Sequence, residues 1–241
     1  MRASVASLAL ALWCAPAAAP AQEVYRLRLG VEAPFVVATL AVAGLPELYA
    51  SRRPAPSCLP ECDPASVNAL DRWVIGSRSD LAEALSNVMV VALPVLGLGL
   101  TLADEQGAAF WQDTFVAVEA YAVHGLVVSL VKAAARRPRP YVYDRSLPAD
   151  VRVGSQSTLS FFSGHSSSAF VTVVAFAETH RRRHEGASVV AVYAAGLTLA
   201  TVVAACRILA GKHFLTDVLA GALVGTAFGL LMPALHDRRA R

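Results

Sequence analysis

Charged side chains are scarce in this chain. Only 16% of its 241 residues are Asp, Glu, Lys or Arg, whereas soluble proteins contain about a quarter. Hydrophobic residues make up 56%, and the mean hydropathy is +0.50. The net charge of +3 is too small to bind nucleic acid through bulk electrostatics. The composition therefore argues against a soluble domain or a nucleic-acid-binding protein, and it indicates a membrane protein of one domain.

Cysteine is also scarce, with four residues in the whole chain. Cys14 follows the bulky Trp13, which argues against a lipoprotein cleavage site, and Cys206 ends an apolar run. Cys58 and Cys62 lie in the polar segment "PAPSCLPECDP". In an oxidising compartment these two would close a small disulfide loop, and in the cytosol they would be free thiols. Their spacing does not decide between the two states.

The first 21 residues have the pattern of a secretory signal peptide. One arginine precedes a short apolar run at residues 5–13, and small residues follow, with Ala19 and Ala21 forming an A-x-A cleavage site before Gln22. The run is short for a membrane span. We therefore predict a signal peptide at 1–21 and a membrane domain at 22–241.

Long apolar runs dominate the remaining chain, and there are six of them. They lie at residues 33–50, 88–103, 115–135, 166–178, 187–205 and 218–235. Several are shorter than the ~20 residues of a typical span, but flanking residues can extend each one. The sequence thus predicts an all-α, integral-membrane bundle of about six transmembrane helices.

The polar residues of the connecting segments gather at one end of this bundle. If six helices alternate across a bilayer, segments 51–87, 136–165 and 206–217 share one membrane face. Segments 104–113 and 180–186 lie on the other face together with the C-terminal tail. An active site is therefore expected at the first face.

The third run ends in a basic segment, "LVKAAARRPRPYVYD". Lys132 lies in the last helical turn, and two prolines then end the helix and hold Arg139 in an extended backbone. Any of these cations alone would also suit a role as an interfacial anchor that reaches the lipid headgroups. We interpret Arg136 and Arg137 in that way.

The fourth run begins with "FFSGHSSSAF". Ser163 is suited to cap the helix, Gly164 allows a ligand to approach the backbone, and His165 lies in the first turn. Free N–H groups at a helix start bind anions. Taken alone, the segment is equally typical of a plain helix cap.

A third cluster lies in "CRILAGKHFLTD", between the last two runs. His213 and Asp217 are spaced i and i+4, so on a helix the carboxylate would reach the imidazole and orient it as a nucleophile or base. Arg207 precedes them, and Lys212 is expected to face only headgroups. A salt bridge at a helix start is the alternative interpretation of the pair.

Together, the three clusters predict a more specific chemistry. They supply cationic donors, an anion-binding helix start and two histidines at one membrane face. This set suits phosphoryl transfer, because cations neutralise the phosphoryl oxygens while one histidine attacks and the other protonates the leaving oxygen. No metal ligands and no cofactor are predicted.

These segments resemble the motifs of the type 2 phosphatidic acid phosphatase superfamily, over residues 132–217. The family pattern is K-x6-RP, then PSGH, then SR-x5-H-x3-D, and the chain has Lys132 with "RPRP", "FSGH" and "CRILAGKHFLTD" in that order. It departs from the pattern with Phe162 in place of Pro and Cys206 in place of Ser. Neither departure removes a catalytic side chain, although Cys206 lacks a hydroxyl that would bond phosphate or backbone.

The resemblance implies a role for each matching residue. His213 would be the nucleophile that forms a phosphohistidine, Asp217 would orient it, and His165 would be the general acid. The phosphate would be held by Lys132, Arg139, Ser163, the Gly164 amide and Arg207.

Within this superfamily the hydrophobic composition favours a membrane lipid phosphatase. The expected partners are membrane lipids and a lipid phosphate substrate, such as undecaprenyl diphosphate, phosphatidylglycerol phosphate, phosphatidic acid or a lipid A phosphate. Nucleic acid is not an expected partner, and the sequence does not predict an oligomeric state. A lipid phosphotransferase, a vanadate-dependent haloperoxidase and a membrane anion transporter are the alternatives. A transporter would spread charges through several helices, whereas only Glu119 and His124 are clear intramembrane candidates.

The orientation of the site in the membrane involves a conflict. The arginines of segment 180–186 and the tail favour the cytoplasm, which leaves the site facing the periplasm of a bacterial inner membrane. A cleaved signal at 1–21 followed by a span at 33–50 would instead put the site inside. Either the signal is uncleaved and spans the membrane, or the first run does not cross, or the site is cytoplasmic. We expect a periplasmic site, with which a Cys58–Cys62 disulfide agrees.

Overall fold

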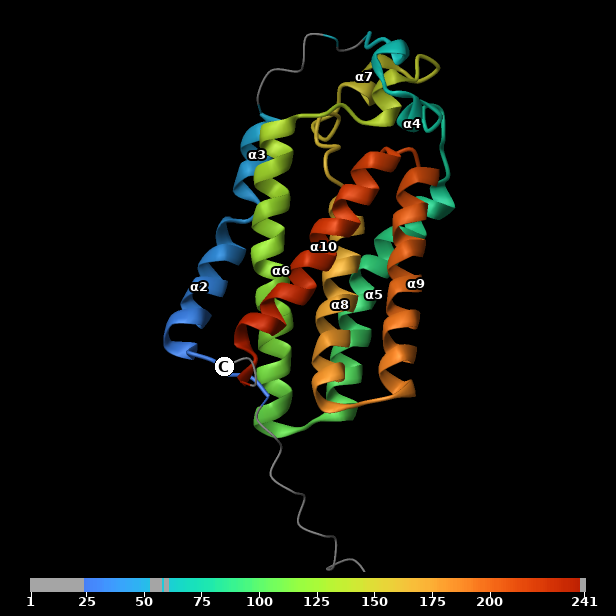
Figure 1. The fold of residues 1–241 in the computed structure, drawn as a ribbon. Coiled ribbons are helices and arrows are strands. Elements are labelled where there is room, and N and C mark those ends of the chain that lie inside the picture. The colour runs from blue at the N-terminus through green and yellow to red at the C-terminus, as the bar shows by residue number, and fades with distance from the viewer. Residues whose placement is uncertain (1–23, 53–57, 59–60, 239–241) are drawn as a thin grey trace, which may run out of the picture.

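A computed structural model of the protein describes residues 24–52, 58 and 61–238, and the predicted signal peptide lies outside them. In this part of the chain the structure is helical and contains no strand (Figure 1). The long helices are α2 (Leu29–Val42), α3 (Leu45–Ser51), α5 (Asp80–Asp104), α6 (Gly107–Ala135), α8 (Gly164–Arg183), α9 (Ala187–Leu209) and α10 (Leu215–His236). The short helices are η1 (Pro64–Ser66), α4 (Ala69–Arg72), η2 (Pro140–Tyr143) and α7 (Ala149–Arg152).

Five helical segments of the described chain are long and apolar enough to cross a membrane. They are Leu29–Ser51, Asp80–Asp104, Gly107–Tyr143, Ala187–Leu209 and Leu215–His236. The first comprises α2 and α3, which are separated by a break at Gly44; α3 begins at Leu45 and has Pro46 in its first turn. The predicted all-helical membrane bundle is confirmed. The fourth predicted run, 166–178, forms α8, which is too polar to be counted among these five segments.

Helix α8 lies in the centre of the bundle (Figure 1). It packs against α5, α6, α9 and α10, and 13 of its 20 residues are buried. Several of its polar residues, among them Ser166, Ser167, Thr172, Thr179 and Glu178, are therefore buried against other parts of the protein. A helix shielded in this way does not need the apolar surface of a lipid-facing span, which explains why α8 is polar and still central.

Glycines bring α10 close to α8. A Cβ atom added at Gly221 would lie 2.7 Å from the Ser163 carbonyl oxygen, and one added at Gly229 would lie 2.7 Å from Cβ of Val174. Small residues at a helix interface permit such close packing in membranes. This contact fixes the start of α8 next to the start of α10.

The two ends of the bundle differ. The loop end is covered by residues 61–79 and 136–163, including α4 and α7 (Figure 1). The arginine end holds Arg181, Arg182 and Arg183. Tyr25 also lies at the arginine end, because it forms an antiparallel bridge with Asp237. The segment Leu29–Ser51 therefore runs from the arginine end to the loop end.

Cys58 and Cys62 form a disulfide. Cys58 follows α3 and Cys62 precedes η1, so the bridge belongs to the connection that covers the loop end. Of the two states that the spacing left open, free thiols and a disulfide, the structure has the disulfide.

Candidate active site

His213 lies in the short turn between α9 and α10 and is almost completely buried, with 1% of its surface exposed. Gly211 shapes this turn with a φ of +65°, and a Cβ atom there would collide with the Ser77 carbonyl oxygen. Nδ1 of His213 is 2.8 Å from the carbonyl oxygen of Ser160. Since a carbonyl only accepts hydrogen bonds, Nδ1 carries the proton and Nε2 keeps its lone pair.

Asp217 lies behind His213, at the start of α10. Its carboxylate is 3.8 Å from His213 Nδ1, which is longer than a hydrogen bond. It accepts hydrogen bonds from the Ser160 hydroxyl at 2.6 Å and from the Phe214 backbone N–H at 2.9 Å. Asp217 therefore contributes a negative charge near the ring and holds Ser160, whose carbonyl contacts the imidazole directly.

Arg137 is part of this network, which corrects its interpretation as a headgroup anchor. Its guanidinium donates to Asp217 at 2.6 Å and to Asp71 at 2.7 Å. It also lies over the ring of Phe214, with 4.5 Å between Cζ and the ring centroid. Both carboxylates are completely buried. The cation is therefore required inside the protein, where it neutralises two buried charges.

Asp71 was not predicted as a site residue, because it lies in a polar connection without a motif. It is buried and accepts hydrogen bonds from the Thr216 amide, the Thr216 hydroxyl and Arg137. Burial raises the pKa of Asp71, but the hydrogen bonds from Thr216 and Arg137 outweigh it and lower the pKa below its ordinary value. Asp71 thus ties the loop end to the first turn of α10.

Lys132 lies in the last turn of α6, beside the start of α8. It is buried, and a Cβ atom added at Gly164 would lie 3.3 Å from its Nζ atom. The ammonium pairs with Glu47 of α3 at 3.1 Å. Gly164 therefore leaves the ammonium next to the first amides of α8, where an anion would contact both.

Arg139 and Arg207 line a cavity of about 410 Å³ at the loop end. Nε of Arg139 donates to the Gln156 carbonyl oxygen at 2.9 Å. Nη1 of Arg207 donates to the Ser86 hydroxyl at 3.1 Å, and its buried Nε has no partner among the described residues. Both guanidiniums thus contact neutral acceptors, which leaves their charge available to an anion in the cavity.

His165 lies in the first turn of α8, which Ser163 caps by accepting the Ser166 N–H. Nε2 of His165 is 2.9 Å from the Asn87 side-chain oxygen, and Arg207 approaches the same oxygen at 3.4 Å. Asn87 therefore links the second histidine to Arg207. Asn87 was not predicted as a site residue, because it lies in α5 just before the apolar run 88–103 and belongs to no motif.

Burial lowers the pKa of His213 well below its ordinary value, and the nearby charges of Arg139 and Lys132 act in the same direction. The imidazole is therefore neutral at pH 7, as a nucleophile requires.

The eight predicted site residues all lie at the loop end. Ser163 connects two of the three segments, because its amide donates to the Asp217 carbonyl at 3.0 Å. Lys212 does not face headgroups alone as predicted, since it pairs with Glu83 at 2.8 Å. Arg136 ends α6 in a left-handed conformation with a φ of 44°.

The chain belongs to the PAP2 superfamily, because the profile of that family matches residues 113–241, more than half of the sequence. All eight predicted site residues lie in this range. The predicted family is therefore confirmed. No curated protein is significantly similar to the chain. A solved structure, the crystal structure of the first transmembrane PAP2-type phosphatidylglycerolphosphate phosphatase from Bacillus subtilis, is similar with 22% identity and a TM-score of 0.49, covering 82% of this chain and 95% of that one.

Proposed function

We propose that this membrane protein is a lipid phosphatase that hydrolyses a phosphate or diphosphate monoester through a phosphohistidine at His213. One observation carries the proposal. The imidazole of His213 is neutral and buried, and its Nδ1 proton is directed to the Ser160 carbonyl. The positive charges of Lys132 and Arg139 lie near enough to this ring to lower its pKa further. A basic Nε2 beside phosphate-binding cations suits attack on phosphorus.

The reaction would proceed in two balanced steps. Nε2 of His213 forms a bond to phosphorus, the P–O bond to the lipid breaks, and His165 gives a proton to the leaving oxygen. Water then attacks phosphorus, His165 takes a proton from the water, the P–N bond to His213 breaks, and phosphate leaves. Lys132, Arg139, Arg207, Ser163 and the Gly164 amide would neutralise and hold the phosphoryl oxygens. In this proposed scheme neither step uses a metal ion.

The cavity beside Arg139 and Arg207 supports a phosphorylated headgroup as substrate. It combines these cations and Lys212 with the apolar side chains of Leu147 and Val151. It opens at the end of an apolar bundle, so lipid tails would stay in the bilayer while the phosphate enters. Four lipids combine a terminal phosphate with tails that stay in the bilayer: undecaprenyl diphosphate, phosphatidylglycerol phosphate, phosphatidic acid and lipid A phosphates.

The decisive experiment combines these four lipids with a His213→Ala variant. Purified protein in detergent should release phosphate from at least one lipid, and the variant should lose more than about 1,000-fold of that rate. His236→Gln, which changes a histidine at the arginine end, is the matched control. Acid-labile labelling of the wild-type protein by a 32P-lipid would identify the phosphohistidine. Undiminished release by His213→Ala would refute the assignment.

A periplasmic site is part of the proposal, and the Cys58–Cys62 disulfide supports it. Tyr25 lies at the arginine end, however, so a signal peptide cleaved in the periplasm would put that end outside and the site inside. A cleaved signal peptide at 1–21 and a periplasmic site therefore exclude each other. We propose the periplasmic site and give up the cleaved signal. Reporter fusions after residues 60 and 184 test this choice, since a cytoplasmic signal at 60 would contradict it.

A further inference from the structure

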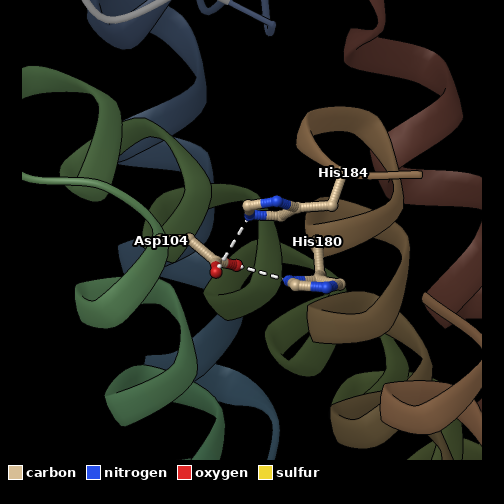
Figure 2. Close-up of side chains that lie close together, drawn as sticks. All are labelled: Asp104, His180 and His184. Carbon is tan, nitrogen blue, oxygen red and sulfur yellow. Dashed lines mark hydrogen bonds and ion pairs between the residues drawn. The ribbon is translucent and has the colours of Figure 1, made fainter. Parts of the chain in front are cut away.

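Three side chains that can bind a metal ion, Asp104, His180 and His184, lie close together (Figure 2). They lie at the arginine end, whereas the proposed active site lies at the loop end. Asp104 ends α5, His180 lies in the last turn of α8, and His184 caps the same helix. One ligand atom from each of the three lies within 4.8 Å of the others. No metal ligands were predicted from the sequence, because Asp104 is distant in sequence from the two histidines, which flank a run of arginines.

The geometry of the three groups is close to that of a coordination site. Nδ1 of His180 is 2.7 Å from one Asp104 oxygen, and Nε2 of His184 is 3.1 Å from the other. The two rings stack with 4.2 Å between their centroids. Two ligand atoms bound at ~2.1 Å to a tetrahedral ion lie about 3.4 Å apart, so side-chain shifts below about 1 Å would admit the ion.

The surroundings also suit a cation. Arg183, which precedes His184 in the sequence, is paired with Asp113 at 2.6 Å and with Glu105 at 3.0 Å. Within the described residues, the polar side-chain contacts of Asp104 are to the two imidazoles. Nε2 of His184, the nitrogen that faces Asp104, is buried and makes no hydrogen bond among those residues. Buried polar atoms of this kind are exceptional in proteins and indicate a site for a further ligand.

We propose that Asp104, His180 and His184 bind a divalent transition-metal ion of the zinc type. Two imidazole nitrogens and one carboxylate oxygen are typical zinc ligands, and water would complete the coordination. The His184 side chain is 40% exposed, which leaves a path for the ion. The 20 residues of α8 span about 30 Å, so the ion would join the ends of α5 and α8 without contact with the phosphoryl site. Its role is to stabilise the bundle.

The test uses the full-length protein purified in detergent without a histidine tag. We expect one Zn²⁺ per chain by equilibrium titration, and Co²⁺ should give the visible absorption of a site with nitrogen ligands. Zn²⁺ should raise the unfolding temperature, because an ion that binds only the folded state stabilises it. EDTA should reverse that rise.

The variants His184→Gln and Asp104→Asn should weaken Zn²⁺ binding by at least about 100-fold. His184 is partly exposed, so its replacement is compatible with folding. His236→Gln, which alters another carboxylate-paired histidine at the same end, should bind Zn²⁺ like the wild type. Absence of Zn²⁺ binding by the wild type at 100-fold excess, or equal binding by His184→Gln, would overturn the proposal. Phosphatase activity is not the readout, so this result is separate from that for His213→Ala.

Discussion

The two ends of the bundle hold arginines in opposite ways. At the arginine end, Arg182 pairs with Glu178 and Asp237, and Arg183 pairs with Asp113 and Glu105. At the loop end, the side-chain hydrogen bonds of Arg139 and Arg207 go to neutral oxygens. A cation matched by carboxylates is already neutralised, whereas one held by neutral acceptors keeps its charge for an anion. The number of arginines at a membrane face therefore says less about function than the charge of their partners.

Among changes that test this difference between the two ends, the largest effect is expected from removing one arginine at each end. Arg207→Gln should lower kcat/KM for the preferred lipid by about 100-fold or more, because one donor to the transition-state charge is lost. Arg183→Gln should leave the activity of the folded protein within about twofold but lower its stability by ~3 kcal/mol, since buried Asp113 loses its partner. Lipid-phosphate hydrolysis and thermal unfolding in detergent measure both.

The comparison would fail if the two variants behaved alike. Equal loss of activity in Arg183→Gln, at equal amounts of folded protein, would mean that the arginine end takes part in catalysis. Full activity of Arg207→Gln would mean that its neutral partners do not reserve it for phosphate. Arg207→Lys is the conservative control, and it should recover only part of the rate because lysine lacks the planar fork of donors.

Arg137 is an exception at the loop end and gives the next largest effect. It is paired there with Asp71 and Asp217, as the arginines of the other end are paired. Arg137→Ala should therefore destabilise the protein by about 3 kcal/mol, because it leaves two buried carboxylates without a cation.

A double variant separates this structural role from a catalytic one. Asp71→Asn in the Arg137→Ala background removes one of the two uncompensated charges, so it should restore part of the unfolding temperature. If Arg137→Ala unfolded at the same temperature as the wild type, the proposal that Arg137 neutralises the two buried carboxylates would be wrong. Thermal unfolding followed by tryptophan fluorescence is the measurement.

The same contrast explains what the sequence could predict. The apolar runs predicted the helical bundle. Because successive membrane spans place alternate connections on the same face, the order of the runs also predicted that all eight candidate site residues lie at one end. Arg137 was misread because periodicity near a helix end does not show whether a cation faces lipid or a buried carboxylate. Its partner Asp71 lies 66 residues away and in no motif.

Helix α8 shows the same limit in the fold. Its polar residues would mark a surface helix in a soluble protein, and only the surrounding helices make it central. The Asp104–His180–His184 cluster likewise depends on the meeting of two helix ends that composition cannot foresee. Patterns within one segment were therefore predictable, and contacts between segments were not.

The smallest effect concerns Glu47, the one carboxylate with a direct ion pair to a predicted phosphate ligand in the described chain. Its oxygen is 3.1 Å from Lys132 Nζ, so it occupies a cation that a phosphate would use and also repels the phosphate. Glu47→Gln should lower the inhibition constant of inorganic phosphate or vanadate by roughly threefold to tenfold, since removing this repulsion is worth ~1 kcal/mol near a surface. Glu105→Gln, which removes a carboxylate paired with Arg183 at the arginine end, is the matched control and should change the constant by less than about twofold. A higher inhibition constant in Glu47→Gln would show that the carboxylate positions Lys132 for phosphate. Lys132 would then be a cation held by a carboxylate, like the paired arginines of the arginine end.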